Sequence, residues 1–396
     1  MVISLNSEIG WIDFDETERD RAQRLMDMFR EQDSRDELGL GAIRDSIADH
    51  LFPGTSTIHT RLRYMLFIPW IFEGLPKHLS PRDIAATARQ REIELIRALI
   101  AGATSDVGII GRDAGDKLKR LPSSVYWSGL ASWGIRHFRG SIGAYCGALP
   151  LWPKENRKDH PDDDLGGTPI GSRLWHARLP GPPNSWPQKA DFDLEPDEVT
   201  FLVDRLVEKH PNSLLTYLAC RQDRADADAI WVHPHFADFP AQPRMLVEHA
   251  KIFSGVMHGA ALLYNLLLSE LRGNEAWIER YRGALAEWSD DLNLKELASW
   301  SLDDFWHETR HPGHTVHEPA KRFVTEWVAH IREAGGIGRD REFAVALVKG
   351  RERKLKKGQS RFANKSARDR WQGKSGIERF QFRWPIAHSY LKDLRR

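Results

Sequence analysis

The chain has 396 residues, of which 41% are hydrophobic and 10% aromatic, and this composition excludes a wholly disordered protein. Lys and Arg number 57 against 56 Asp and Glu, so the net charge is only +1. Two cysteines are too few for a disulfide framework, and the first residues lack the basic and apolar stretches of a signal peptide. We therefore expect a cytoplasmic protein.

The first predicted helices follow capping and spacing patterns. Asp15 and Glu18 match a capping box, and apolar residues follow them at helical spacing. Apolar residues at every fourth position predict a second helix over 43–51, which the turn sequence FPGTS at 52–56 ends.

Two later segments carry clear start and stop signals. Residues 80–83 read SPRD, with an N-cap serine and a proline in the first turn, and they predict a helix that stops near Gly102. Residues 121–135 predict a short helix that is capped by Ser123 and ended by Gly134.

An irregular connector is expected in the middle of the chain. Nine of the 21 prolines fall between Pro150 and Pro196, together with several glycines. Beyond it, residues 245–271 form the most apolar predicted helix, which polar residues and glycines mark as a buried core helix rather than a membrane span. Further predicted helices cover 275–288 and 318–333.

Few apolar residues alternate in the manner of strands, so the sequence predicts a mainly α, two-lobed, multi-helical protein. It leaves room for small β-hairpins of the winged-helix type. The predicted division is an N-terminal helical lobe at 1–149, an irregular Pro/Gly-rich connector at 150–195, a C-terminal helical lobe at 196–335 and a basic nucleic-acid-binding segment at 336–396.

The basic segment is the strongest charge feature. Residues 349–374 hold eleven Lys and Arg and two Asp and Glu. Cations recur every four residues from Lys349 to Lys365, which on one helix would form a basic stripe, although Gly350 and Gly358 favour two short helices equally. Interleaved aromatic residues favour contact with phosphates, with a solvated surface helix or a flexible basic tail as the alternative. The residues expected to contact DNA are Arg61, Arg63, Lys349, Arg353, Lys354, Lys357, Arg361, Lys365, Arg368 and Arg370.

Residues 307–317, HETRHPGHTVH, match the zinc-protease pattern H-E-x-x-H at His307 and His311, with His317 as a third ligand. Pro312 disfavours helical geometry at His311, and the glycine of the longer pattern is missing. We therefore expect a polar surface loop and no metal, with His307, His311 and His317 as weak candidate ligands.

Polar groups in two other regions are candidates for chemistry on DNA. Asp45 and Glu37 lie in a glycine-rich stretch and are candidate catalytic carboxylates, with structural ion pairs as the alternative. Flat rings, and an amide inside an apolar helix, are candidates for holding an extruded base, with ordinary core packing as the alternative. The base-pocket candidates are Tyr126, Trp127, Tyr264 and Asn265.

Four segments resemble, in the same order, a bacterial family of chains of similar length that is known as a domain of unknown function and is linked to phage defence. These segments are ELGLGAIRDSIADHLFPGTSTIHTRLRYMLFIPWI, PSSVYWSGLASWGI, GAALLYNLLLSEL and RERKLKKGQSRFAN. The resemblance implies a similarity to anti-phage DNA glycosylases that act on glucosylated hydroxymethylcytosine.

A glycosylase flips its target base and stabilises an oxocarbenium-like sugar with a carboxylate. Asp45 is the first choice for this group and Glu37 the second. The reaction requires no cofactor and no membrane, and the expected partner is phage DNA with modified bases. The alternatives are a non-catalytic DNA-binding component of a defence complex and a zinc-dependent hydrolase that uses the HETRH segment.

Overall fold

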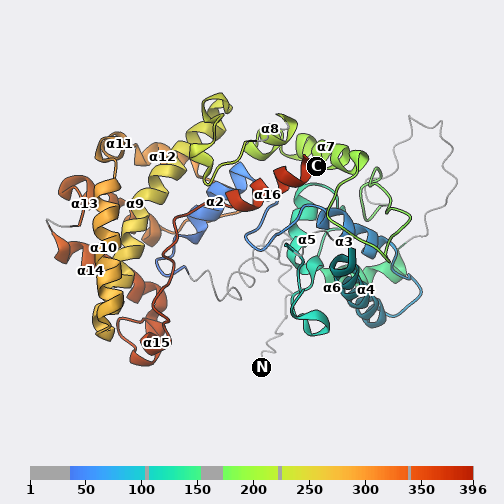
Figure 1. Cartoon of the computed structure of the whole chain (residues 1–396), viewed down its shortest axis with the longest axis horizontal. Coiled ribbons are helices and arrows are strands. Elements are labelled where there is room, and N and C mark those ends of the chain that lie inside the picture. Colours follow the sequence, from blue (N-terminus) through green and yellow to red (C-terminus); the bar gives the residue numbers. More distant parts are fainter. Residues whose placement is uncertain (1–35, 103–106, 153–172, 222–224, 338–339, 396) are drawn as a thin grey trace, which may run out of the picture.

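A computed structural model describes residues 36–102, 107–152, 173–221, 225–337 and 340–395. Within these ranges the chain forms fifteen α-helices, α2 to α16, joined by loops and short 3-10 turns (Figure 1). The helices are α2 (Gly41–Leu51), α3 (Tyr64–Glu73), α4 (Pro81–Gly102), α5 (Pro122–Ser132), α6 (Ile142–Ala148), α7 (Pro196–Lys209), α8 (Leu214–Arg221), α9 (Ala241–Arg272), α10 (Glu275–Asp291), α11 (Leu294–Ser299), α12 (Leu302–Glu308), α13 (Glu318–Ala334), α14 (Arg341–Lys356), α15 (Lys365–Asp369) and α16 (Trp384–Leu394).

The prediction of a mainly α protein is confirmed. The described ranges contain one isolated β-bridge, between Arg136 and Trp175, and no β-strand. The small winged-helix hairpins that the sequence left open are therefore absent from the described part of the chain.

Figure 1 shows two helical lobes. One contains α3 to α6, the other contains α9 to α15, and α2, α8 and α16 lie between them. The middle position of α2 and α16 brings an early and a late segment of the chain side by side. The termini of the described chain thus help to join the two lobes.

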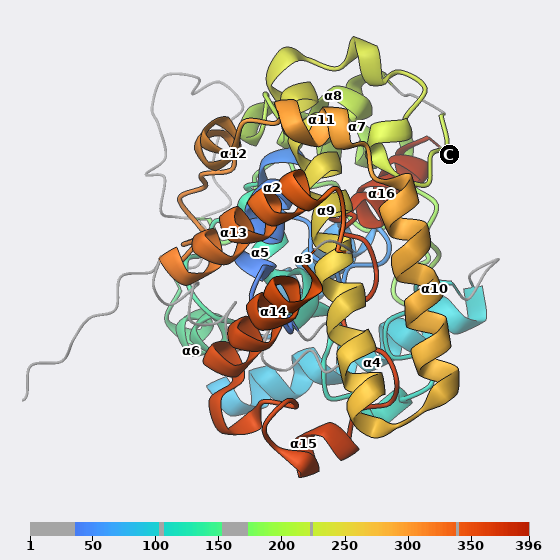
Figure 2. The ribbon, with the colours of Figure 1, turned by 90° about the vertical axis from the view of Figure 1, so that its left-hand side faces the viewer.

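The core of the second lobe is α9, which α10, α13 and α14 surround (Figure 2). Trp288 of α10 donates its indole N–H to the Gly255 carbonyl at 2.8 Å, and Trp327 of α13 donates to the Val256 carbonyl at 2.9 Å. Among the described residues, α9 is long and apolar enough to cross a membrane, but 78% of its most apolar window is buried inside the protein. This burial agrees with the prediction of a core helix.

The first lobe is built around α3, whose residues are buried from Tyr64 to Phe72. The described part of the predicted connector, 173–195, is irregular and covers this helix. The Trp70 indole N–H donates to the Pro180 carbonyl at 2.7 Å, and the Phe67 and Trp186 rings stack at 5.4 Å. The connector therefore contributes to the core of the first lobe.

Helices α7 and α8 follow the connector, and α7 with the turn after it contacts the first lobe. Arg63, just before α3, pairs with Glu198 of α7 at 2.8 Å. The Ser132 hydroxyl at the end of α5 lies 3.0 Å from His210 Nε2, just after α7. The lobe boundary at residue 196 stays a prediction, and these contacts favour placing α7 with the first lobe.

Most predicted helix limits in the described ranges are confirmed. Helix α2 ends at Leu51 before the predicted turn, α4 spans Pro81–Gly102, and α9, α10 and α13 match their predicted ranges. The prediction of Ser123 as a cap is wrong: α5 begins at Pro122 with Leu121 as N-cap, and the Ser123 hydroxyl donates to Glu92 at 2.8 Å. The predicted helix after Asp15 lies outside the described residues.

The basic segment forms two helices rather than one. Helix α14 ends at Lys356, a 3-10 turn follows, and α15 begins at Lys365. Lys357 has a φ of 48°, a left-handed conformation that a continuing α-helix does not allow. The alternative of two short helices is thus the correct one.

Candidate functional site

A cavity of about 520 Å³ lies between the two lobes. Its wall combines α2, the loop after α2, one face of α5, the segment after α7, the first turn of α9, the loop between α12 and α13, and Arg383. Two Asp, four His and four Lys or Arg side chains line it, together with several Ser and Thr, but no Phe, Tyr or Trp among its described lining residues. The described lining of the cavity therefore consists mainly of ionisable and hydrogen-bonding groups, and its aromatic rings are imidazoles.

Helix α2 supplies both carboxylates of the cavity. The Asp36 carboxylate accepts the backbone N–H groups of Leu40 and Gly41, at 2.7 and 2.5 Å, and this anchors the start of α2. Asp45 and Asp49 are four residues apart, so they project from the same face one turn apart. Their side chains are 7% and 15% exposed, so both groups are largely shielded from solvent.

Arg383 joins the two carboxylates to the loop that follows α2. It is the N-cap of α16 in a left-handed conformation with a φ of 63°. Its Nη1 donates to Asp49 Oδ1 and to the Thr55 carbonyl at 2.8 Å, while its Nη2 lies 3.4 Å from Asp45 Oδ1. Asp45 also accepts two hydrogen bonds from Arg44, at 3.0 and 3.1 Å.

The electrostatic balance at Asp49 favours its charged form. Burial alone raises the pKa of this carboxyl, but the charge of Arg383 and the hydrogen bond from His314 outweigh burial and hold the pKa well below its usual value. For Arg383, burial alone lowers the pKa, but the charges of Asp49 and Asp45 outweigh burial, so the pKa of Arg383 is raised overall. Asp49 is therefore an anion throughout the neutral range.

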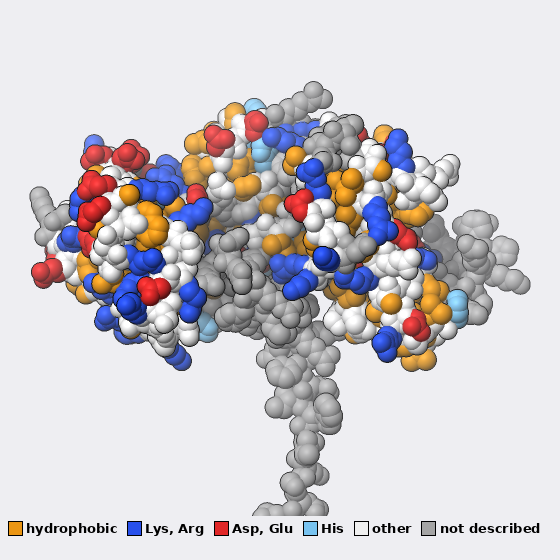
Figure 3. Space-filling model, turned by 60° about the horizontal axis from the view of Figure 1, so that its bottom comes forward, with side chains coloured by type: hydrophobic (Ala, Val, Ile, Leu, Met, Phe, Trp, Pro, Cys, Tyr) orange, Lys and Arg blue, Asp and Glu red, His pale blue; other side chains and the backbone are white. Residues whose placement is uncertain are grey.

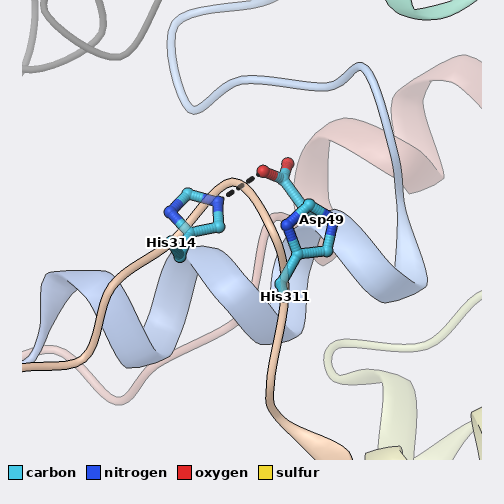
Figure 4. Close-up of side chains that lie close together, drawn as sticks. All are labelled: Asp49, His311 and His314. Carbon is cyan, nitrogen blue, oxygen red and sulfur yellow. Dashed lines mark hydrogen bonds and ion pairs between the residues drawn. The ribbon is translucent and has the colours of Figure 1, made fainter. Parts of the chain in front are cut away.

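Two histidines approach Asp49 from the loop between α12 and α13. His314 Nε2 lies 2.6 Å from Asp49 Oδ2 (Figure 4). The Gly313 N–H donates to His311 Nδ1 at 3.0 Å, and the His311 ring meets the edge of the His50 ring with centroids 4.8 Å apart. His311 and His314 thus lie close to Asp49 in the wall of the cavity, and His50 contacts His311.

Contacts with α2 fix this loop. The Ser46 hydroxyl donates to the Thr309 carbonyl, and His50 Nε2 lies 3.0 Å from the Arg310 carbonyl. Both carbonyls belong to residues that precede His311 in the chain. The histidines therefore reach Asp49 because the backbone before them is bound to the same helix that carries Asp49.

Residues 6–396 match a family of unknown function, DUF6361. The chain belongs to the DUF6361 family. The resemblance to a domain of unknown function is confirmed at this level, and comparison with curated proteins and with solved structures gave no match.

The predicted zinc pattern does not form in this DUF6361 chain. Helix α12 ends at Glu308, so His307 and His311 do not lie one turn apart on one helix. His307 and His317 are exposed, whereas His311 lines the cavity with His314 and Asp49. Sequence reasoning missed His314 and Asp49 because the zinc-protease pattern places its ligands at the spacing of a continuous helix.

The two predicted catalytic carboxylates lie in different places. Asp45 lines the cavity. Glu37 is not among its lining residues: its Oε1 accepts hydrogen bonds from Arg361 at 2.9 Å and from Ser375 at 2.7 Å, and its Oε2 lies 3.3 Å from Lys356. Glu37 thus has the structural ion pairs that the sequence left open, and Asp45 has both ion pairs and access to the cavity.

The predicted base-pocket residues lie in the protein interior. The Tyr126 hydroxyl accepts the Thr60 N–H and donates to the Arg61 carbonyl, both at 2.8 Å, and burial raises the pKa of Tyr126 to about 12. Trp127 packs edge to face against Tyr145. Other residues of α5 line the cavity. They are Ser124, Val125, Ser128, Gly129 and Ser132.

Tyr264 and Asn265 of α9 are also fully buried. Asn265 Nδ2 donates to the Ser375 carbonyl at 2.8 Å, and Asn265 Oδ1 accepts the Ser375 N–H at 2.9 Å. The Tyr264 hydroxyl accepts from Arg361 at 3.1 Å. Both side chains therefore hold the segment around α15 against α9, and their role in base recognition stays a prediction.

The predicted DNA-contacting cations divide into two groups. Arg61 and Arg63 pair in the interior with Asp393 and Glu198, both at 2.8 Å, and Arg361 pairs with Glu37. Lys349 and Arg368 are half-buried. The exposed group lies on or after α14 and α15 and consists of Arg353, Lys354, Lys357, Lys365 and Arg370. Figure 3 shows Lys and Arg side chains, with Asp and Glu among them, on the lobe that contains these helices.

Proposed function

We propose that this chain is a cytoplasmic DNA N-glycosylase of phage defence, which excises glucosylated hydroxymethylcytosine from phage DNA and requires no cofactor for that step. The observation that carries the proposal is that Asp45, the carboxylate expected from the sequence, lines a cavity between the lobes beside cationic and hydroxyl side chains. The substrate class comes from the sequence resemblance to anti-phage glycosylases.

The lining supports chemistry on a nucleotide. Cleavage of the N-glycosidic bond develops positive charge on the sugar, and a fixed carboxylate stabilises this charge. Asp45 is held by Arg44 and Arg383, and Asp49 lies one turn along the same helix face. Asp45 would face the sugar and would be the catalytic group.

Other lining groups suit the rest of the nucleotide. Arg120 and Lys209 supply positive charge for phosphate, and Ser128 supplies a hydroxyl group. His210 offers a ring on which a base can stack, and burial lowers the pKa of its imidazole. In this proposal, an imidazole ring takes the stacking role that the sequence assigns to aromatic side chains.

The exposed cations of α14 and α15 support DNA as the polymer. Arg353, Lys354, Lys357, Lys365 and Arg370 are exposed, and a group of such side chains attracts the phosphate backbone without reading its sequence. This observation equally favours a second candidate, a non-catalytic DNA-binding protein, because binding alone needs no carboxylate in the cavity.

The decisive experiment incubates the full chain with two DNAs of one sequence, one with cytosine and one with glucosylated hydroxymethylcytosine. We expect alkali-labile sites and a released modified base only from the modified DNA. Asp45→Asn should lower the rate by about 10²-fold or more, whereas Asp204→Asn, a substitution at an exposed site on α7, should leave it unchanged.

The two candidate functions give different results in the same assay. Binding of both DNAs with no released base from either would reject the glycosylase and support the binding protein. Because Asp45 is buried and ion-paired, a thermal unfolding curve of Asp45→Asn is needed to show that any decrease in activity occurs in a folded chain.

A further inference from the structure

We propose that Asp49, His311 and His314 bind one divalent first-row transition-metal ion, such as Zn²⁺, at the end of the cavity (Figure 4). This inference goes beyond the glycosylase proposal and does not depend on it. It adds an ion to a cavity for which the excision step requires none.

The three side chains lie close to one another. One potential ligand atom from each of the three residues lies within 4.8 Å of the others. Zn²⁺ takes nitrogen and oxygen ligands at about 2.0–2.2 Å, so ligand atoms around a tetrahedral ion are about 3.3 Å apart. Figure 4 shows Asp49 from α2 and both histidines from one loop gathered around a common space. Small side-chain rotations therefore suffice to place all three atoms around an ion.

Asp49 and His314 already direct an oxygen and a nitrogen atom at each other. Their Oδ2 and Nε2 atoms lie 2.6 Å apart, within hydrogen-bond distance. An ion that binds both atoms would replace this hydrogen bond with two metal–ligand bonds.

Hydrogen bonds from the surrounding protein support the three ligands. Asp49 Oδ1 is held by Arg383, which leaves Oδ2 directed at His314. The loop before His311 is bound to α2 through the Thr309 and Arg310 carbonyls. Such supporting hydrogen bonds orient ligands and are typical of functional metal sites.

Charge and ligand type decide which ions fit. Arg383 opposes a cation, but Asp45 and Asp49 together offset both Arg383 and Arg44. Two imidazoles and one carboxylate suit Zn²⁺ and its neighbours, whereas Mg²⁺ prefers oxygen ligands alone. With three protein ligands, the fourth position of the ion faces the cavity, where a bound water becomes acidic.

The test is calorimetric titration of the full chain, stripped with chelator, with ZnCl₂ and with MgCl₂ in the absence of DNA. We expect one equivalent of Zn²⁺ to bind and no binding of Mg²⁺. His314→Ala and His311→Ala should each weaken Zn²⁺ binding by more than about 100-fold, because removing a ligand costs more than removing a residue that only orients one.

The matched controls are His307→Ala and His317→Ala, which remove exposed histidines from the same segment and should bind Zn²⁺ as the parent chain does. Zn²⁺ should also raise the unfolding temperature of the parent chain but not that of His314→Ala. Zn²⁺ binding that survives in both His311→Ala and His314→Ala, or that disappears in His307→Ala, would overturn the proposal. Because no DNA is present, neither result bears on the glycosylase assay.

Discussion

Arg61 Nη2 lies 2.8 Å from Asp393 Oδ1, and this ion pair joins the segment before α3 to the last helix of the chain. The Asp393 side chain is 3% exposed, and its Oδ2 also accepts the Leu62 N–H at 2.9 Å. Asp393→Ala leaves a buried guanidinium and a buried N–H without this acceptor. We expect the free energy of unfolding to fall by about 3–5 kcal/mol, measured by urea denaturation.

A surface ion pair provides the control for this prediction. Arg178 and Asp204 lie 3.8 Å apart, and their side chains are 68% and 49% exposed. Asp204→Ala should change the free energy of unfolding by less than about 1 kcal/mol, since solvent screens exposed pairs. Equal decreases in Asp393→Ala and Asp204→Ala would contradict a structural role for the buried pair.

Two glycines of α9 should respond to alanine in opposite directions. A Cβ at Gly259 would overlap the Trp288 ring, whereas a Cβ at Gly255 would meet no atom within 4 Å. Gly259→Ala should therefore destabilise the protein by about 1–3 kcal/mol through overpacking against α10. Gly255→Ala should stabilise it by about 0.5–1 kcal/mol, because alanine favours the helix. Thermal unfolding compares the two, and the same sign for both would refute the packing argument.

Replacing exposed cations of the basic segment should change DNA binding, whereas replacing the buried Arg361 should change stability. A triple variant of Lys354, Lys357 and Lys365 to Gln should weaken duplex binding, with little change in stability. The slope of log affinity against log salt should become shallower by about 0.9 for each phosphate that the variant no longer neutralises. Arg361→Gln should instead lower the free energy of unfolding by about 3 kcal/mol, because it breaks the buried pair with Glu37.

Fluorescence anisotropy of labelled duplex DNA at several salt concentrations measures the effect of the triple variant, and urea denaturation measures that of Arg361→Gln. The parent chain is titrated beside both variants under the same conditions. An unchanged salt dependence in the triple variant would argue against a phosphate-binding surface on α14 and α15.

The local part of this fold could be predicted from the sequence. The SPRD start of α4 and the apolar run of α9 carry their signals within a few residues, so the predicted limits of both helices are nearly correct. Ser123 shows where such signals fail: its hydroxyl has the chemistry of a cap, but Glu92, from another helix, accepts its hydrogen bond. A local pattern does not reveal a distant partner.

The candidate site, like the partner of Ser123, depends on contacts between residues that are distant in the sequence. Asp49, His314 and Arg383 come from three segments far apart in the chain, and the fold alone brings them into contact. The polar stretch around Asp45 predicts a candidate carboxylate, but no signal in the sequence pairs Arg383 with either Asp. The four-residue spacing of Asp45 and Asp49 is the one available clue, since it places both groups on one helix face.

A substitution at Asn265 distinguishes a structural role of this side chain from a role in base recognition. Its amide makes both a donor and an acceptor contact with the Ser375 backbone in the interior. Asn265→Ala leaves that N–H and carbonyl unpaired and should cost about 2–3 kcal/mol of unfolding free energy, with DNA affinity unchanged. Gln90→Ala, at an exposed position of α4, is the control and should change neither quantity. A stable Asn265→Ala chain with altered preference between modified and plain DNA would instead support the base-pocket prediction.

Glu92 should make stability depend on pH. Its side chain is buried, and burial raises the pKa of its carboxyl from 4.5 to about 7, although Ser123 partly offsets this through hydrogen bonds to both oxygens. Between these two pH values the folded chain holds a proton that the unfolded chain releases. The stabilising contribution of protonated Glu92 is therefore complete below about pH 4.5, decreases as the pH rises towards 7, and is lost above it.

The variant Glu92→Gln isolates this effect from other titrating groups. Its amide oxygen can accept the Ser123 N–H while its amide nitrogen donates to the Ser123 hydroxyl, so it mimics the protonated acid. The parent chain should lose up to about 3 kcal/mol relative to Glu92→Gln between about pH 4.5 and about pH 8, as urea denaturation at each pH would measure. Parallel stability curves for the two chains would show that Glu92 remains ionised in its buried position, with the Ser123 hydrogen bonds sufficient to hold its charge.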